Sequence, residues 1–455
     1  MNFIIDNNTQ IINDIREIYF QTPSYKLKDV IAKHFIPSTD EKKRNAEVST
    51  PPKLCSEMIS KIPSEFWNTP QKVFEPCCGK GNFVLEIFDK FNTGLTLAIP
   101  DNKERCRVII EECIYFADLT TLNVFITTEL LRCEAQSVFY TEGDEEINYK
   151  FNSNNGDTIQ LNIEDKWGLK GFDAVIGNPP YNNSQNNTGK KGGGDLLWNK
   201  FVEKSLNEYL VDKGKLLYVH PSGWRKPESS KSKYQGLFKL MTSENQMNYL
   251  EIHDTNDGMK TFNCGTRYDW YIIEKIPIYK NTIIKFQNGD ICSQNLSKWS
   301  FLPNENLDLI YKLINNDIGE ECNIIYSRNN YGSDKKWVSS IKNEEYKYPL
   351  VHSTPKAGIR YMYSNINTNG HFNISKIIFG DSGINNAVID IEGNYGMTQH
   401  SMGIEINDIN EGKNLKKVLE SPEFKKVLES CSWSNYQIDW RLFTYFKKDF
   451  WKEFM

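Results

Sequence analysis

The chain has 455 residues and a formal net charge of −5, with an estimated isoelectric point of about 5.9. This length allows two domains with full cores, and the charge excludes a uniformly basic nucleic-acid binder while leaving room for a basic cleft. The cysteines are scattered without zinc-ligand spacing, and neither a signal peptide nor a membrane-spanning apolar stretch is evident, so we expect a cytoplasmic protein with reduced thiols and no metal.

The amino-terminal part of the chain leads into a helix start. Residues 1–45 are expected to form a helical lead-in, because charged residues interrupt their apolar positions. The tripeptide Thr50-Pro51-Pro52 follows. Thr50 can cap a helix there, and Pro51 can take the first helical position.

The segment from Val73 to Phe83 has the pattern of a strand, a glycine-containing turn and a helix start. It lacks the spacing of a phosphate-binding loop. Gly79 and Gly81 permit close backbone approach and Glu75 supplies a negative charge, so the segment favours S-adenosylmethionine, whose methionine portion is cationic. Cys77 follows a proline, as the nucleophile of a cytosine methylase does, but its place inside the turn favours a packing role.

Two further aspartates fit the same cofactor. Asp118 ends the apolar run 114–117 and can accept from ribose hydroxyls, with Asp101 as the alternative. Asp157 follows Gly156 and can accept from an adenine amino group, although an aspartate at a turn is equally often structural.

Short apolar runs alternate with helical periodicity from about residue 72 to 275. Such alternation predicts an α/β domain with a mainly parallel sheet covered by helices, and ligands bind at the carboxyl ends of its strands. After about residue 280 the pattern changes to short β-like runs rich in Asn and Gly, followed by an aromatic helical tail. We therefore expect a first domain over residues 46–279 and a second over residues 280–455.

The tetrapeptide Asn178-Pro179-Pro180-Tyr181 follows an apolar run, 172–177, that predicts a buried strand. The prolines hold the chain extended and donate no hydrogen bonds, so the Asn178 amide and the Pro179 carbonyl become fixed acceptors beside an aromatic ring. Adenine, cytosine and glutamine each present an NH2 group that fits. Two acceptors would localise the nitrogen lone pair for attack on a methyl group, with Tyr181 stacking on a base.

Several basic residues are candidates for phosphate contact, although each is individually more typical of a solvated surface. The loop 182–194 is expected to order on nucleic acid. The candidates are Lys190, Lys191, Arg225, Lys226, Lys335 and Lys336.

The order of these motifs resembles the gamma-class N6-adenine DNA methyltransferases, many of which belong to Type II restriction-modification systems. The resemblance covers about residues 45–275. It implies a Rossmann-like S-adenosylmethionine-dependent domain that methylates a flipped adenine. The cofactor contacts it implies are Thr50, Glu75, Cys77, Gly79, Gly81, Asp118, Asp157 and Asn178, and the residues implied to hold the adenine are Asn178, Pro179, Pro180 and Tyr181.

The resemblance also implies an aromatic residue on the other side of the base, for which Phe262 is the candidate, with Tyr268 behind it. Family members often carry an aromatic after the aspartate that corresponds to Asp157, whereas this chain has Thr158. The second domain, residues 280–455, has the size and position of a mixed α+β target-recognition domain. Double-stranded DNA is therefore the expected partner, bound by a monomer.

Other activities fit the same tetrapeptide. RNA adenine methylation remains open, and release-factor methyltransferases use a similar motif to methylate a protein glutamine. A non-catalytic DNA-binding protein is disfavoured by the intact tetrapeptide. A fused nuclease is not expected, because roughly 45 residues before the first domain are too few to hold one.

Overall fold

The computed structural model describes residues 48–139, 147–182, 196–228, 232–314, 319–433 and 437–455. The expected helical lead-in and the lysines Lys190 and Lys191 lie outside these ranges. The chain divides into two compact units, one of Met1–Trp224 with Gly236–Lys298 and one of Arg225–Gln235 with Trp299–Met455.

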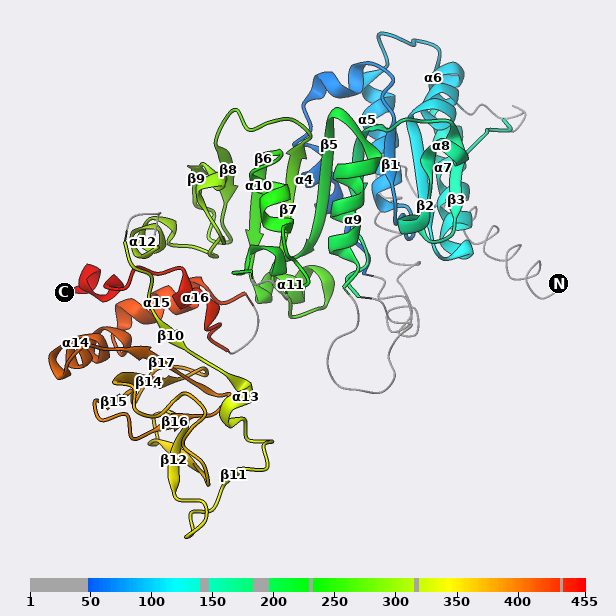
Figure 1. Ribbon diagram of the computed structural model, residues 1–455. Coiled ribbons are helices and arrows are strands. Elements are labelled where there is room, and N and C mark those ends of the chain that lie inside the picture. The colour runs from blue at the N-terminus through cyan, green and yellow to red at the C-terminus, as the bar shows by residue number, and fades with distance from the viewer. Residues whose placement is uncertain (1–47, 140–146, 183–195, 229–231, 315–318, 434–436) are drawn as a thin grey trace. The chain divides into compact units, whose positions relative to one another are not determined.

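The first unit is built on a sheet that has nine strands among the described residues, in the order β3-β2-β1-β4-β5-β7-β6-β8-β9 (Figure 1). The strands β3, β2, β1, β4 and β5 are parallel neighbours, whereas β7 is antiparallel to both β5 and β6. This confirms the predicted α/β class. The strands are β1 (Val73–Glu75), β2 (Ile114–Asp118), β3 (Asn152–Asn155), β4 (Phe172–Gly177), β5 (Leu210–Pro221), β6 (Gln246–His253), β7 (Tyr268–Glu274), β8 (Thr282–Lys285) and β9 (Ile291–Gln294).

The helices of this unit lie on both faces of the sheet because successive strand residues point to opposite sides. They are α4 (Pro52–Ile59), α5 (Asn82–Gly94), α6 (Asn102–Val108), α7 (Thr121–Phe139), α8 (Ile163–Trp167), α9 (Trp198–Lys204), α10 (Leu237–Thr242) and α11 (Thr255–Phe262). Strands β8 and β9 belong to this sheet although they follow residue 279, the expected domain boundary.

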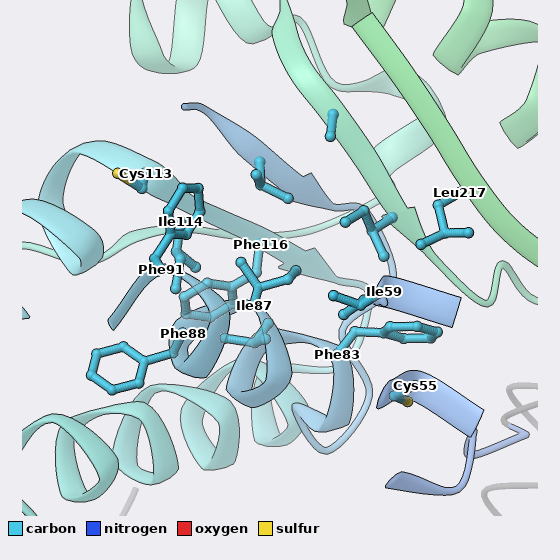
Figure 2. Close-up of a cluster of buried hydrophobic side chains, with 14 of the residues drawn as sticks. Cys55, Ile59, Phe83, Ile87, Phe88, Phe91, Cys113, Ile114, Phe116 and Leu217 are labelled. Carbon is cyan, nitrogen blue, oxygen red and sulfur yellow. The ribbon is translucent and has the colours of Figure 1, made fainter. Parts of the chain in front are cut away.

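One face of the sheet packs against α4, α5 and α7. Figure 2 shows side chains of α4 and α5, including Ile59, Phe83 and Phe88, beside the strand residues Phe116 and Leu217. The other face carries an aromatic cluster in which Phe74 stacks on Phe172 with ring centroids 4.7 Å apart. Burying both faces explains why the central strands read as nearly continuous apolar runs.

The second unit contains two four-stranded sheets among its described residues, ordered β10-β17-β14-β15 and β11-β13-β12-β16. All of their pairs are antiparallel except β12 with β16, which confirms a mixed α+β second part. Its strands are β10 (Ile324–Ile325), β11 (Val338–Ser339), β12 (Tyr348–Ser353), β13 (Arg360–Ser364), β14 (Lys376–Gly380), β15 (Val388–Asp390), β16 (Gly396–Met397) and β17 (Ser401–Glu405). Its helices are α12 (Leu307–Leu313), α13 (Arg328–Tyr331), α14 (Ile409–Leu419), α15 (Pro422–Ser430) and α16 (Arg441–Thr444).

The interior of the second unit contains an aromatic cluster and a buried ion pair. Phe424, Phe443 and Phe450 pack on one another with ring centroids 5.6–6.2 Å apart, so this part of the aromatic tail is core. The Lys376 ammonium lies 2.7 Å from the Asp390 carboxylate, and both side chains are almost completely buried.

In the described part of the chain, no helix has the length and apolarity needed to cross a membrane, and no cluster of metal-ligating side chains occurs.

Candidate active site

A cavity of about 320 Å³ opens at the carboxyl ends of β1, β2, β3 and β4 in the first unit. The chain leaves β1 towards β2 on one side, while β4 lies on the other side, and such a reversal of strand order is where open α/β sheets bind ligands. The predicted site residues that line it are Thr50, Glu75, Cys77, Gly79, Asp118, Asp157, Asn178, Pro179 and Pro180. Segments far apart in the sequence thus meet in one cavity.

The glycine turn between β1 and α5 forms one wall. Gly79 and Gly81 both adopt positive φ angles, of 49° and 86°, which L side chains rarely tolerate. A Cβ atom at Gly81 would also lie 3.1 Å from the hydroxyl oxygen of Thr127 on α7. Gly81 itself lies behind the cavity wall, so its role is to shape the turn that Gly79 presents.

Glu75, the last residue of β1, is 2% exposed, and its Oε2 atom has no hydrogen-bond partner. Burial, followed by the nearby Asp118 carboxylate, raises the pKa of Glu75 well above its usual value, while the backbone N–H of Val84 lowers it. A buried carboxylate with a free oxygen in a cavity wall fits a cationic group of a ligand. The wall is therefore chemically suited to the methionine portion of S-adenosylmethionine.

Cys77 also lines the cavity, and burial followed by the Asp118 and Glu75 carboxylates raises the pKa of its thiol. A thiol held protonated is a poor nucleophile. This agrees with a packing role for Cys77 and opposes the covalent role of a cytosine-methylase cysteine.

Asp118 ends β2 with its carboxylate held by three donors of the chain. Its Oδ2 atom accepts from the Gly79 backbone N–H at 3.0 Å, and its Oδ1 atom accepts from the Thr120 N–H at 2.8 Å and the Asn123 amide at 3.2 Å. Burial still raises its pKa. The alternative, Asp101, caps α6 through the Glu104 N–H at 2.8 Å and does not line the cavity.

Asp157 starts a short turn, Thr158–Gln160, and caps it by accepting from the Ile159 N–H at 3.0 Å. The turn is held from behind, because the Thr158 hydroxyl donates to the Pro76 carbonyl at 2.8 Å and the Tyr209 hydroxyl donates to the Thr158 carbonyl. Tyr209 belongs to a π-helical turn, Ser205–Tyr209, that follows α9.

Leu119 and Ile159 are among the apolar residues of the cavity wall that sequence reasoning missed, and the others include Phe83, Leu197 and Phe201. Leu119 is 57% exposed, which is unusual for a leucine next to a buried strand. Leu119 directly follows Asp118, and Ile159 lies two residues after Asp157. This proximity to predicted cofactor contacts was the sequence signal that could have identified them. They supply apolar surface where the chain lacks an aromatic after Asp157.

Asn178 follows β4 and has a fixed amide group. Its Nδ2 atom donates to the Val48 carbonyl at 2.9 Å and to the Thr50 hydroxyl at 3.0 Å. Its Oδ1 atom is enclosed and has no hydrogen-bond partner among the described residues. Enclosed polar atoms without partners are rare in folded proteins, so this acceptor fits a donor on a ligand.

The structure corrects the capping role predicted for Thr50. Helix α4 begins at Pro52 with Pro51 as its N-cap, and no side chain caps it. The Thr50 hydroxyl is instead engaged by the amide of Asn178. Tertiary contact has displaced the local capping interaction that the sequence favoured.

Tyr181 and Phe262 do not line the cavity. Burial, followed by the nearby thiol of Cys264, raises the pKa of Tyr181, whereas the side-chain amide of Asn178 lowers it. Phe262 ends α11 and forms an edge-to-face pair with Tyr268, with ring centroids 4.9 Å apart. The stacking roles of Tyr181 and Phe262 stay predictions.

The structure removes Arg225 from the candidate DNA contacts. It is fully buried in the second unit, where its guanidinium donates to the carbonyls of Leu302 and Pro303 at 3.2 and 3.1 Å and to the side chain of Asn304 at 2.9 Å. Lys226 and Lys335 are half-buried, and Lys336 is exposed. Burial lowers the pKa of Lys226.

Part of the chain is similar to known methylases. Residues 112–262 match the model of the Eco57I restriction-modification methylase family. A Mycoplasma pneumoniae protein described as an uncharacterized adenine-specific methylase is 24% identical over 238 residues, covering 40% of this chain and 56% of that protein. The chain thus spans little more than half the length of that relative.

Two solved structures share the fold. The Type IIL restriction-modification enzyme MmeI in complex with DNA is similar with a TM-score of 0.53 and 10% identity, over 96% of this chain and 67% of that chain. A DrdV–DNA complex is similar with a TM-score of 0.54 and 10% identity, over 95% of this chain and 59% of that chain.

The sheet and its motif-lined cavity define the methyltransferase class of α/β folds. Over residues 112–262 the chain is similar to the Eco57I family of restriction-modification methylases. The resemblance to adenine-specific DNA methyltransferases, inferred from the motifs, is confirmed.

Proposed function

We propose that this protein is a site-specific DNA methyltransferase that transfers a methyl group from S-adenosylmethionine to the exocyclic amino group of a flipped adenine. The observation that carries the proposal is the enclosed, unpaired Oδ1 atom of Asn178 in the wall of a cavity that also contains the unpaired Oε2 atom of Glu75. One atom suits the amino group of an acceptor, and the other suits the cationic portion of a methyl donor.

Four parts of the cavity wall would hold the cofactor. Glu75 would pair with its ammonium group, and the turn at Gly79 would let its backbone approach closely. Asp118 would accept from ribose hydroxyls, since each of its oxygens carries two acceptor positions. Leu119 and Ile159 would pack on the adenine ring while Asp157 accepts from its amino group. When bound, S-adenosylmethionine supplies an electrophilic methyl group on a sulfonium.

The acceptor side depends on the end of β4. The Asn178 Oδ1 atom and the Pro179 carbonyl would accept the two N–H bonds of the adenine amino group, which localises the nitrogen lone pair. Both groups are held before the substrate arrives, one by its amide contacts and the other by the proline ring, so little reorganisation is needed. After methyl transfer the nitrogen carries an extra proton, which is acidic and passes to water.

Double-stranded DNA is the proposed partner, bound by a monomer. The amino group of adenine is inaccessible to Asn178 within a duplex, so the base must be extruded. The second unit would then recognise the target sequence, with Lys226, Lys335 and Lys336 as candidate phosphate contacts. The MmeI and DrdV structures, which share the fold, are both DNA complexes, and this supports the choice.

RNA adenine and protein glutamine are the competing acceptors, because both present the same NH2 geometry. Incubation with tritiated S-adenosylmethionine and unmethylated duplex DNA, RNA or release factor separates the three. We expect label in DNA, located on N6 of adenine by nucleoside analysis. Label in RNA or protein with none in DNA would refute the proposal.

Asn178→Ala tests the acceptor site. We expect methyl transfer to fall at least roughly 100-fold, as for other preorganised hydrogen-bond groups at reacting centres, while cofactor binding measured by calorimetry persists. Asn288→Ala, in the exposed turn between β8 and β9, is the matched control and should leave both values unchanged. Loss of cofactor binding in a folded Asn178→Ala protein would place Asn178 in the cofactor site instead.

A further inference from the structure

We propose that Thr50 is a positioning residue for Asn178, in that its hydroxyl fixes the amide orientation that leaves Oδ1 facing the substrate. This inference rests on the proposed methyl-transfer function. It gives Thr50 a role in the chemical step, distinct from the cofactor contact that the motif resemblance implies.

The hydrogen bonds of Asn178 define only one orientation of its amide. The NH2 end has two donors, and both are used, one by the Thr50 hydroxyl at 3.0 Å and one by the Val48 carbonyl at 2.9 Å. If the amide turned over, its oxygen would face the Val48 carbonyl, and two acceptors would repel each other. The two contacts therefore direct Oδ1 away from residues 48–50 and leave it without a partner in the part of the chain that the structure describes.

Thr50 is itself held firmly enough to act as a reference point. It is 4% exposed, and its backbone carbonyl accepts from the Asn82 amide at 2.8 Å. The Asn82 amide also donates to the Ser49 hydroxyl at 3.2 Å. Asn82 is the first residue of α5, so the segment is fastened to the helix that follows the glycine turn.

The Thr50 hydroxyl has no competing use in the helix beside it. Helix α4 starts at Pro52 with Pro51 as its N-cap, so Thr50 lies one residue outside the capping position. The sequence position that predicts a cap thus supports the Asn178 contact instead. The same segment lines the cavity, so it links the cofactor wall to the acceptor group.

The test compares Thr50→Val, which keeps the shape and removes the hydroxyl, with Thr50→Ser, which keeps the hydroxyl. Each protein is assayed at saturating tritiated S-adenosylmethionine on unmethylated genomic DNA, and its Kd for S-adenosylhomocysteine is measured by calorimetry. For Thr50→Val we expect a roughly 10- to 100-fold lower transfer rate, since small misplacements of catalytic groups have effects of this size, with a Kd within about threefold of wild type. Thr50→Ser should stay within about threefold of the wild-type rate.

Two further variants show whether Thr50 acts through Asn178. The double variant Thr50→Val/Asn178→Ala should be no slower than Asn178→Ala alone, because a group without its partner has nothing left to orient. Thr242→Val is the matched control. It removes a buried hydroxyl that bonds only within α10, to the Phe238 carbonyl at 2.7 Å, and should leave the rate unchanged.

Four results would overturn the inference. The first is a Thr50→Val protein with a wild-type rate, and the second is one that binds S-adenosylhomocysteine more weakly but keeps its rate at saturation. The third is a Thr50→Ser protein as slow as Thr50→Val. The fourth is a double variant in which the rate losses of the two single substitutions add. Thr50→Ala replaces Thr50→Val if the latter fails to fold. Absence of transfer by the wild-type protein would instead refute the proposed function, which separates the two failures.

Discussion

Replacing the buried carboxylate of Glu75 by an amide is predicted to stabilise the ligand-free protein and to weaken its cofactor binding. The two effects share one cause. In the ligand-free cavity the charge of Glu75 is buried near the Asp118 carboxylate, which destabilises the fold, whereas in the complex the same charge would pair with a cation. Glu75→Gln keeps the size of the side chain and removes its charge.

The magnitudes follow from the surroundings of Glu75. Burial and the Asp118 carboxylate disfavour the charged form of Glu75, and each pKa unit of this effect corresponds to roughly 1 kcal/mol. Above the folded pKa of Glu75, the melting temperature of ligand-free Glu75→Gln should therefore exceed that of wild type by at least roughly 2 °C. A hydrogen bond to a charged group contributes about 1.5–3 kcal/mol, so the Kd for S-adenosylmethionine should rise roughly 10- to 150-fold.

The pH dependence of the stability difference has a definite sign. Burial and the Asp118 carboxylate raise the pKa of Glu75 in the folded protein above its value in the unfolded chain. The carboxyl group of Glu75 therefore binds its proton more tightly in the folded protein than in the unfolded chain. As pH rises from the unfolded pKa through the folded pKa, the contribution of Glu75 to the free energy of unfolding declines. The advantage of Glu75→Gln over wild type should grow between pH 5 and pH 8.

Thermal melts across that pH range, with calorimetry of cofactor binding, check both effects. Glu208→Gln is the control for loss of one negative charge, because Glu208 forms an exposed ion pair with Lys204 and should change either value little. A ligand-free Glu75→Gln protein less stable than wild type, or one that binds S-adenosylmethionine equally well, would refute the reasoning.

Three other substitutions probe the surrounding structure. Gly81→Ala should destabilise the protein by about 1–3 kcal/mol and raise the Kd for the cofactor, because φ at residue 81 is 86° and the new Cβ atom would crowd the side chain of Thr127. An unchanged melting temperature would contradict this prediction. Tyr209→Phe should raise the Kd for the cofactor about 3- to 10-fold, because the Tyr209 hydroxyl donates to the Thr158 carbonyl, and should leave the rate at saturating cofactor unchanged. A lower rate at saturation would contradict this role of Tyr209. Arg225→Met should destabilise the second unit by at least about 2 kcal/mol, because it leaves buried carbonyls unpaired. Limited proteolysis after residue 299 should then be faster. Loss of DNA affinity with unchanged proteolysis would restore Arg225 as a DNA contact.

The alternation of strands and helices was predictable because each element carries its own periodicity. The apolar runs that became β1, β2, β4, β5 and β7 were all visible in the sequence. The antiparallel placement of β7 between β5 and β6 was not, since strand order depends on which long-range pairing buries most surface. For the same reason β8 and β9 join this sheet beyond the expected boundary.

The site was predictable where chemistry follows a strand end directly. Glu75, Asp118 and Asn178 each follow or end an apolar run, whereas Asp157 follows the polar strand β3. All four line one cavity because the carboxyl ends of parallel strands meet at the same edge. Side chains whose role depends on a distant partner were not predictable in this way. Arg225 reads as a surface cation in the sequence, yet carbonyl groups about 80 residues later hold it in the interior.

By itself the sequence determined which groups the chain can offer, namely a glycine turn, three acidic strand ends and a proline-fixed amide, since each depends on residues adjacent along the chain. Only the tertiary structure decided what those groups face. Pro51 takes the N-cap position of α4, and the buried Thr50 hydroxyl instead accepts from the amide of Asn178, 128 residues away, which would otherwise lack an acceptor. That contact leaves Oδ1 of Asn178 as the free acceptor of the cavity wall.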